Sequence, residues 1–128
     1  MSSLITSNIS DGTTSVPTGY VVNGSAKAWV NFNGTGTAVI RESLNISSLT
    51  DNATGDFRTS FTSSMANADF SICSATDQNG VAAYNFQGVE VFGSQSVDYV
   101  AGLYRPNTGS DVKADVSRIR RAIHGELA

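Results

Sequence analysis

Few residues of this chain have the types and spacing that catalysis or metal binding requires. The sequence contains one histidine, His124, and one cysteine, Cys73. A common zinc site needs four protein ligands or three and a water, and an activated thiol needs a neighbouring base. No local motif joins the two residues, and the simpler interpretation of Cys73 is a small, buried apolar position. We therefore expect no catalytic residue, no metal and no cofactor.

Three aspartates are the other residues that could do chemistry. Asp51 and Asp56 flank one turn-forming stretch, and Asp77 lies in another. Such carboxylates can hold Ca²⁺, but their spacing does not match a calcium-binding loop. Paired carboxylates in one groove would suit hydrolysis of a polysaccharide. Turn formation explains all three aspartates, and calcium binding and polysaccharide hydrolysis stay as alternatives.

Composition indicates a single globular domain of 128 residues. Hydrophobic residues make up 40% and charged residues only 15%, which favours a turn-rich β-structure over disorder. The net charge of −3 argues against general nucleic-acid binding, which needs a basic surface. The chain opens with no leader pattern, and no apolar run approaches the length of a membrane span. We expect a protein that is made in the cytoplasm and is not inserted into a membrane.

Most of the chain is predicted to form short strands. Residues 1–19 alternate weakly and are predicted to form an extended N-terminal arm that gains most by lying on a neighbouring chain. Over residues 20–104, strands recur at roughly ten-residue spacing with Gly, Asn and Asp between them. This spacing predicts about seven or eight antiparallel strands in a β-sandwich or barrel-like module.

The strand around Trp29 shows the predicted alternation most clearly. Ala28, Val30 and Phe32 occupy one face of this strand, and Trp29 occupies the other. A tryptophan on the second face is either half covered or part of an interface. The stretch 33–36 (NGTG) then turns the chain, and its glycines are predicted to take positive φ.

Residues 105–128 are predicted to form a C-terminal α-helix. Apolar residues recur along one helical stripe, namely Val112, Val116, Ile119 and Ile123. The arginines Arg118, Arg120 and Arg121 lie late in the segment, where cations suit the helix dipole, and Gly125 can end the helix. The stripe packs either on the chain's own sheet or on a neighbouring subunit. The arginines are either solvated or in contact with an acidic partner.

One stretch carries a family resemblance. It comprises residues 24–37 (GSAKAWVNFNGTGT), 40–43 (IRES), 44–52 (LNISSLTDN), 54–56 (TGD) and 61–62 (FT). These residues resemble a module of tail-fibre proteins from tailed bacteriophages, common in phages of marine bacteria and cyanobacteria. The resemblance implies a β-rich, trimeric module without catalytic residues. The short N-terminal arm and the predicted terminal helix depart from the family's pattern.

The sequence therefore predicts a non-enzymatic virion structural protein, assembled in the host cytoplasm. We expect a tail-associated fibre or adhesin that forms a homo-oligomer, with a trimer favoured, and contacts other virion proteins. The residues expected at such interfaces are Trp29, Arg118, Arg121 and the helical stripe. A loop that holds Tyr84 and Phe86 is a candidate for contact with a surface glycan or protein of the host. The alternative is a capsid decoration (cement) protein bound to the head lattice.

Overall fold

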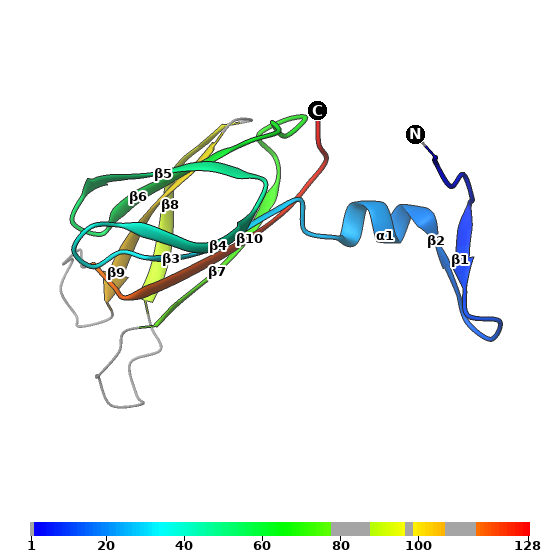
Figure 1. Ribbon diagram of the computed structural model, residues 1–128, viewed down its shortest axis with the longest axis horizontal. Helices are drawn as coiled ribbons and strands as arrows, with labels where there is room; N and C mark the ends of the chain where they lie inside the picture. The colour runs from blue at the N-terminus through cyan, green and yellow to red at the C-terminus, as the bar shows by residue number, and fades with distance from the viewer. Residues whose placement is uncertain (1, 78–87, 97–98, 107–114) are drawn as a thin grey trace.

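The computed structural model of the chain is mainly β, with antiparallel sheets and one short helix among the residues that it describes (Figure 1). These are residues 2–77, 88–96, 99–106 and 115–128. The strands are β1 (Asn8–Ser10), β2 (Ser15–Pro17), β3 (Ala28–Asn33), β4 (Val39–Leu44), β5 (Ile46–Ala53), β6 (Asp56–Phe61), β7 (Ser71–Asp77), β8 (Gly88–Ser96), β9 (Tyr99–Pro106) and β10 (Arg118–His124), and the helix is α1 (Thr18–Gly24).

Two four-stranded sheets form the body of the molecule, which is called the module below. The first sheet has the order β4-β3-β10-β7 and the second has the order β5-β6-β9-β8. All strand pairs are antiparallel, and the two sheets face each other in Figure 1. The predicted mainly β, antiparallel fold is confirmed, and the arrangement is compatible with the predicted β-sandwich.

One half of the core joins the middle strands of the two sheets. Val30 and Phe32 of β3 and Ile119 of β10 pack with Phe57 of β6 and with Val116. The rings of Phe32 and Phe57 meet edge to face with centroids 5.4 Å apart, a geometry that aromatic pairs favour. The burial of Val30 and Phe32 confirms the alternation predicted for β3.

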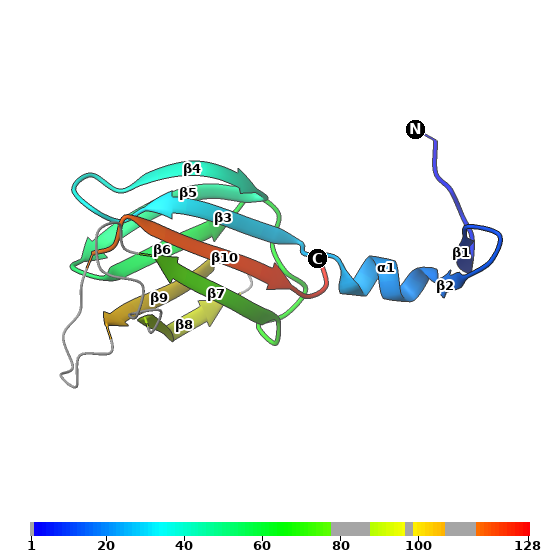
Figure 2. The same cartoon turned by 90° about the horizontal axis from the view of Figure 1, so that it is seen from below.

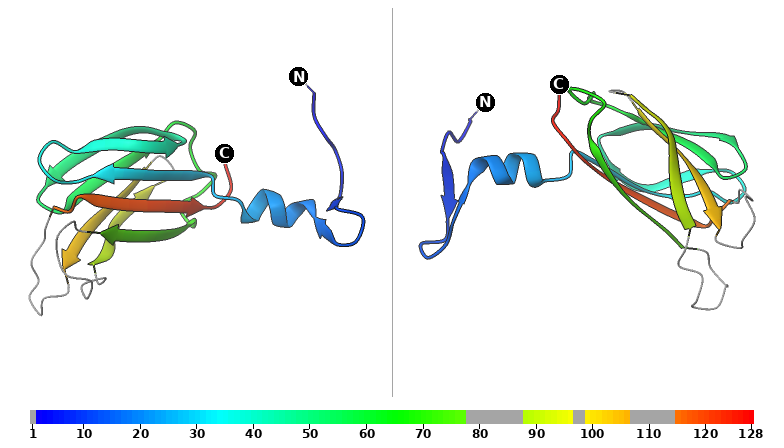
Figure 3. Two further views of the ribbon diagram at one scale, coloured as in Figure 1. Left: turned by 60° about the horizontal axis from the view of Figure 1, so that its bottom comes forward. Right: turned by 180° about the vertical axis from the view of Figure 1, so that it is seen from behind.

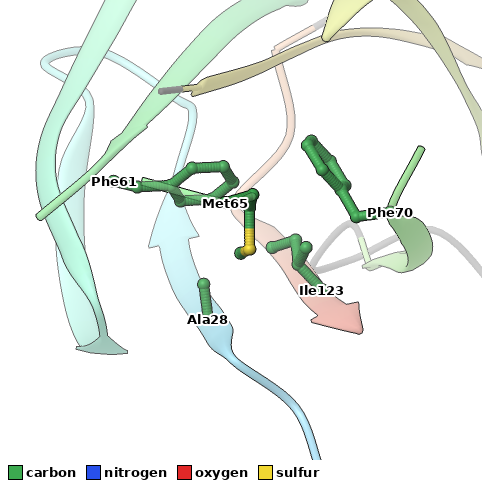
Figure 4. Close-up of a cluster of buried hydrophobic side chains, with 5 residues drawn as sticks. All are labelled: Ala28, Phe61, Met65, Phe70 and Ile123. Atoms are coloured by element: carbon green, nitrogen blue, oxygen red, sulfur yellow. The ribbon is translucent and has the colours of Figure 1, made fainter. Parts of the chain in front are cut away.

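The other half of the core lies toward the end of the module where β3 begins and β10 ends. Figure 4 shows its five buried side chains converging from both sheets and from the segment between β6 and β7: Ala28, Phe61, Met65, Phe70 and Ile123. The rings of Phe61 and Phe70 also meet edge to face, with centroids 5.7 Å apart. A backbone bridge between Met65 and Leu127 joins the C-terminal residues to this cluster.

The predicted C-terminal helix is wrong over residues 118–124, which form β10. This strand lies between β3 and β7 and pairs with both, so its backbone groups are satisfied along two ladders. Ile119, Arg121 and Ile123 alternate into the core with period two. The inward position of Arg121 interrupts the apolar alternation of this strand. The spacing of Val116, Ile119 and Ile123 therefore matched a helical period more closely than the period of two that a strand requires.

The turn after β3 uses its two glycines for different reasons. Gly36 has φ of +65°, a left-handed conformation that favours glycine, as predicted. Gly34 does not have a positive φ, which corrects the prediction for that position. A Cβ at Gly34 would lie 2.7 Å from the ring of Phe57 and 3.0 Å from the carbonyl oxygen of Val116. Close packing against the core explains this glycine.

An asparagine carries the chain from the first sheet to the second. Asn45 lies between β4 and β5 and has φ of +57°, which asparagine tolerates better than most residues. Its side-chain amide donates to the carbonyl of Ser63 at 3.1 Å and accepts from the Ser63 N–H at 2.7 Å. These two hydrogen bonds hold the connection between β4 and β5 against the segment that follows β6.

Candidate functional site

The N-terminal arm, residues 2–24, carries most of the exposed large apolar side chains among the residues whose side-chain burial is described. It contains the hairpin β1–β2 and helix α1, and no residue of either is buried. Of the ten exposed large apolar side chains among the residues whose side-chain burial is described, seven lie in the arm: Leu4, Ile5, Ile9, Val16, Tyr20, Val21 and Val22. Leu4 and Ile5 are 86% and 93% exposed. Exposed apolar patches are typical of surfaces that contact proteins, ligands or membranes, so the arm is a candidate docking surface.

Hydrogen bonds of Lys27 and His124 hold the base of the arm. Lys27 Nζ donates to the carbonyl of Ser25 at 2.8 Å and also to the carbonyl of Val22. The imidazole Nδ1 of His124 lies 3.1 Å from the carbonyl oxygen of Gly24, a contact that needs the proton on Nδ1. These contacts fix the end of α1 against β3 and β10. The two views of Figure 3 show α1 and the β1–β2 hairpin extending clear of both sheets.

The arm is almost uncharged. Asp11 is the only Asp, Glu, Lys or Arg between residues 2 and 26. The backbone N–H groups of Thr14 and Thr13 donate to its carboxylate, at 2.7 and 2.9 Å, and hold the pKa of Asp11 below its usual value. The carboxylate therefore stabilises the β1–β2 turn, and no charged side chain interrupts the apolar surface of α1.

The predicted interface stripe at the C-terminus is instead core. Val116, Ile119 and Ile123 have no exposed surface, and they pack between the two sheets of their own chain. Their burial excludes the interpretation in which they dock on a neighbouring subunit, and it fits the alternative of packing on the chain's own sheet. Val112 lies outside the described residues, as do Tyr84 and Phe86 of the predicted host-contact loop.

The two predicted interface arginines lie in different surroundings. Arg121 is only 2% exposed, so the interpretations of a solvated or partner-binding charge are both wrong for it. Its guanidinium donates to Thr59 Oγ1 and to the carbonyl of Phe57, each at 3.1 Å, and lies over the ring of Phe32. Arg118 is half-buried at the start of β10.

Trp29 remains a candidate interface residue. It is half-buried on the outer face of β3, opposite the core side chains of the same strand. This position keeps both sequence interpretations open, because a half-covered ring can still contact a partner. Cys73 is exposed on the same outer face, so its predicted burial is wrong.

The described residues contain no candidate metal centre. No group of three or more His, Cys, Asp or Glu lies close enough to hold a metal among them. A hollow of about 530 Å³ is lined by one face of α1, at Gly19, Tyr20, Asn23 and Gly24. Two of these residues are glycines, and the other two supply one phenol and one amide. No helix in the described part of the chain is long and apolar enough to cross a membrane.

The helix in the arm was missed because its residues were assigned to the β-module. Tyr20, Val21 and Val22 were included in the range 20–104, while α1 places them on the arm. The available signal was Pro17, directly before the first helical residue, where proline is well tolerated. A second signal was the absence of charge across the whole segment.

Comparisons with known proteins do not add to this description. No protein-family model matches the sequence, and no curated protein or solved structure matches it either. The resemblance of residues 25–61 to phage fibre modules stays a prediction from the sequence. The function is therefore argued from the exposed arm and from the module that carries it.

Proposed function

We propose that this protein is a non-enzymatic structural component of a tailed-bacteriophage virion, a tail-associated fibre or adhesin. The observation that carries the proposal is the arm, which exposes seven large apolar side chains beyond the module. Fully burying one such side chain contributes about 1.5–3 kcal/mol. A partner that covers several of them gains enough to hold the protein on a particle.

The module and the arm have separate roles in this proposal. The module is folded around its own two-part core and does not need the arm for burial of Phe32, Phe57 or Ile123. It therefore serves as the displayed part, and the arm serves as the part that joins the chain to a neighbouring copy in the particle. The loop that holds Tyr84 and Phe86 is proposed to contact a host surface glycan or protein. The resemblance of residues 25–61 to fibre modules supports this division.

The proposed assembly is a homotrimer. An arm that projects from one end of a chain contacts a different surface on its neighbour, which makes a heterologous interface. Heterologous interfaces close into rings when the rotation between copies allows it, and a three-fold ring is the symmetry that the fibre resemblance implies.

Fractionation of purified virions tests the proposal. Heads and tails are separated, and the protein is quantified in each by mass spectrometry against the major head and tail proteins. We expect it in the tail fraction at a copy number close to that of other fibre proteins. Recovery with heads, at a stoichiometry close to that of the major capsid protein, would instead support the capsid decoration protein. Its absence from both fractions would contradict a virion role.

A further inference from the structure

The outer face of the first sheet carries an apolar row that crosses all four strands. In register, Leu44 of β4 lies opposite Trp29 of β3, Trp29 opposite Ala122 of β10, and Ala122 opposite Cys73 of β7. Leu44 is 50% exposed, Cys73 is exposed, and Trp29 and Ala122 are half-buried. The sheet that carries this row faces the viewer in Figure 2. These four residues are called the apolar row.

Polar residues border the apolar row on both sides. The next outward positions on one side include Glu42, Asn31 and Arg120, which are paired in register across β4, β3 and β10. On the other side, His124 of β10 lies opposite Ser71 of β7. Side chains two residues apart on a strand share a face, so the row is a narrow apolar band between two polar ones.

The arm of the same chain does not cover this row. It leaves the module at Gly24, beside His124, and continues away from the sheets in each view of Figures 1 and 3. One chain thus presents two apolar surfaces at the same end, one on the arm and one on the sheet. To cover the row of its own molecule, the arm would have to turn back at Gly24, whose carbonyl oxygen lies 3.1 Å from Nδ1 of His124.

We propose that the apolar row binds the N-terminal arm of a second copy of this chain. This inference rests on the proposed function, because it names the partner that the arm takes when the protein assembles. The arm has no charged residue except Asp11, and the row has none, so the contact buries no unpaired charge. An identical copy carries both the uncharged arm and the uncharged row, so one sequence supplies both halves of the contact.

The native Cys73 makes the contact measurable by disulfide trapping. Three donor chains carry Cys73→Ala together with Ile5→Cys, Val16→Cys or Val22→Cys, positions that are all exposed on the arm. Each donor is mixed with unmodified chain, which supplies Cys73 as acceptor, and mildly oxidised. We expect a disulfide between the arm of a donor and Cys73 of the other copy, identified by peptide mass.

A matched acceptor tests whether trapping is specific. Thr50 is exposed on β5 of the second sheet, so Cys73→Ala/Thr50→Cys moves the thiol to the other side of the module. We expect this acceptor not to be trapped. Equal trapping of both acceptors, or no trapping of Cys73 by any donor, would overturn the proposal. A further chain carries Ile5→Cys and keeps Cys73, and disulfides that form in it only within one chain would overturn the proposal as well.

Charge placed on the row gives a second, independent measurement. Leu44→Glu should reduce the oligomer to monomers in light scattering at low micromolar protein. Val39→Glu is the control, because Val39 is 54% exposed on the outer side of the same strand but lies outside the row. Dissociation by both variants or by neither contradicts the proposal. Trapping without incorporation into virions would contradict only the proposed function, and incorporation without trapping would contradict only this inference.

Discussion

At the scale of single residues, Arg121 carries a charge that serves the interior of the protein. Its guanidinium reaches from β10 across the core to Thr59 and to the backbone of Phe57 on β6, so it ties one sheet to the other. A buried guanidinium is retained only when hydrogen bonds satisfy it, and Arg121 also lies 5.3 Å from the ring centre of Phe32. The residue therefore fixes how the two sheets meet.

Removal of this side chain should destabilise the module strongly. Arg121→Ala loses charge-assisted hydrogen bonds and leaves a cavity, so we expect the free energy of unfolding to fall by about 3–5 kcal/mol. Urea denaturation followed by tryptophan fluorescence measures the change. Arg120→Ala is the matched control, because Arg120 is the exposed neighbour on the same strand, and a loss below about 1 kcal/mol is expected. Equal losses from the two variants would contradict the role given to Arg121.

The close packing of Gly34 leads to a second prediction at the residue scale. A methyl group there would lie 2.7 Å from the Phe57 ring, which the core holds against Phe32. We expect Gly34→Ala to lower the free energy of unfolding by about 1–3 kcal/mol through overpacking. Gly19→Ala has open space around it and should be neutral or better in thermal unfolding. A Gly34→Ala variant as stable as the original chain would show that the ring can move aside.

At the scale of elements, the sequence predicted the β-module better than its ends. Period-two patterns such as that of Ala28, Val30 and Phe32 identify a strand whenever one face meets a core, and they did so here. The pattern failed for β10 because Arg121 occupies a core position that sequence analysis assigns to solvent. Tertiary contacts decided this element, since a strand between β3 and β7 is paired on both sides.

The candidate site could be predicted only in part. Residues 1–19 were predicted to form an arm, and none of residues 2–19 is buried, while Trp29 was assigned to the strand face opposite Ala28, Val30 and Phe32, where it is half-buried. The apolar row could not be predicted, because it requires the register of four strands. Leu44 and Cys73 lie on the two edge strands of the sheet, and they belong to the same row only because Trp29 and Ala122 lie in register between them.

Strand β10 leads to a prediction about truncation. Residues 115–128 supply the middle strand of the first sheet and the core side chains Val116, Ile119 and Ile123. A chain that ends at residue 114 should therefore fail to fold, with loss of β-type circular dichroism and of dispersed amide resonances. Deletion of residues 2–24 is the comparison, and it should leave both signals intact. A folded chain without β10 would contradict the sheet order.

The β1–β2 hairpin should respond to acid separately from the module. The folded pKa of Asp11 is lowered, so its stabilising effect is complete above the unfolded pKa and is lost as pH falls through the folded value. We expect the amide resonances of Thr13 and Thr14 to shift in that acidic window as their hydrogen bonds to Asp11 weaken. Asp11→Asn should remove this pH dependence. If the Thr13 and Thr14 resonances of the Asp11→Asn variant still shifted over the same pH range, another group would be responsible for the effect.

At the scale of the whole molecule, the arm and the module are joined but energetically separate. The core clusters contain no residue of the arm, and the arm has no buried residue of its own. Such a division lets a protein fold as a monomer and assemble later, because assembly buries surface that folding leaves exposed. In the proposed oligomer, residues 2–24 would then supply the apolar surface that assembly buries.

This separation predicts the effect of the arm on molecular mass. The full chain should scatter light as a trimer, three times 13.4 kDa or about 40 kDa, and the chain without residues 2–24 should remain folded but monomeric. Since the contact is apolar, raising the salt concentration should not dissociate the trimer, whereas an assembly held by surface ion pairs would weaken. A trimer that persists without the arm would place the contact in the sheets themselves. The edge strands of the two sheets, β4 and β7 in the first and β5 and β8 in the second, would then be the surfaces to alter.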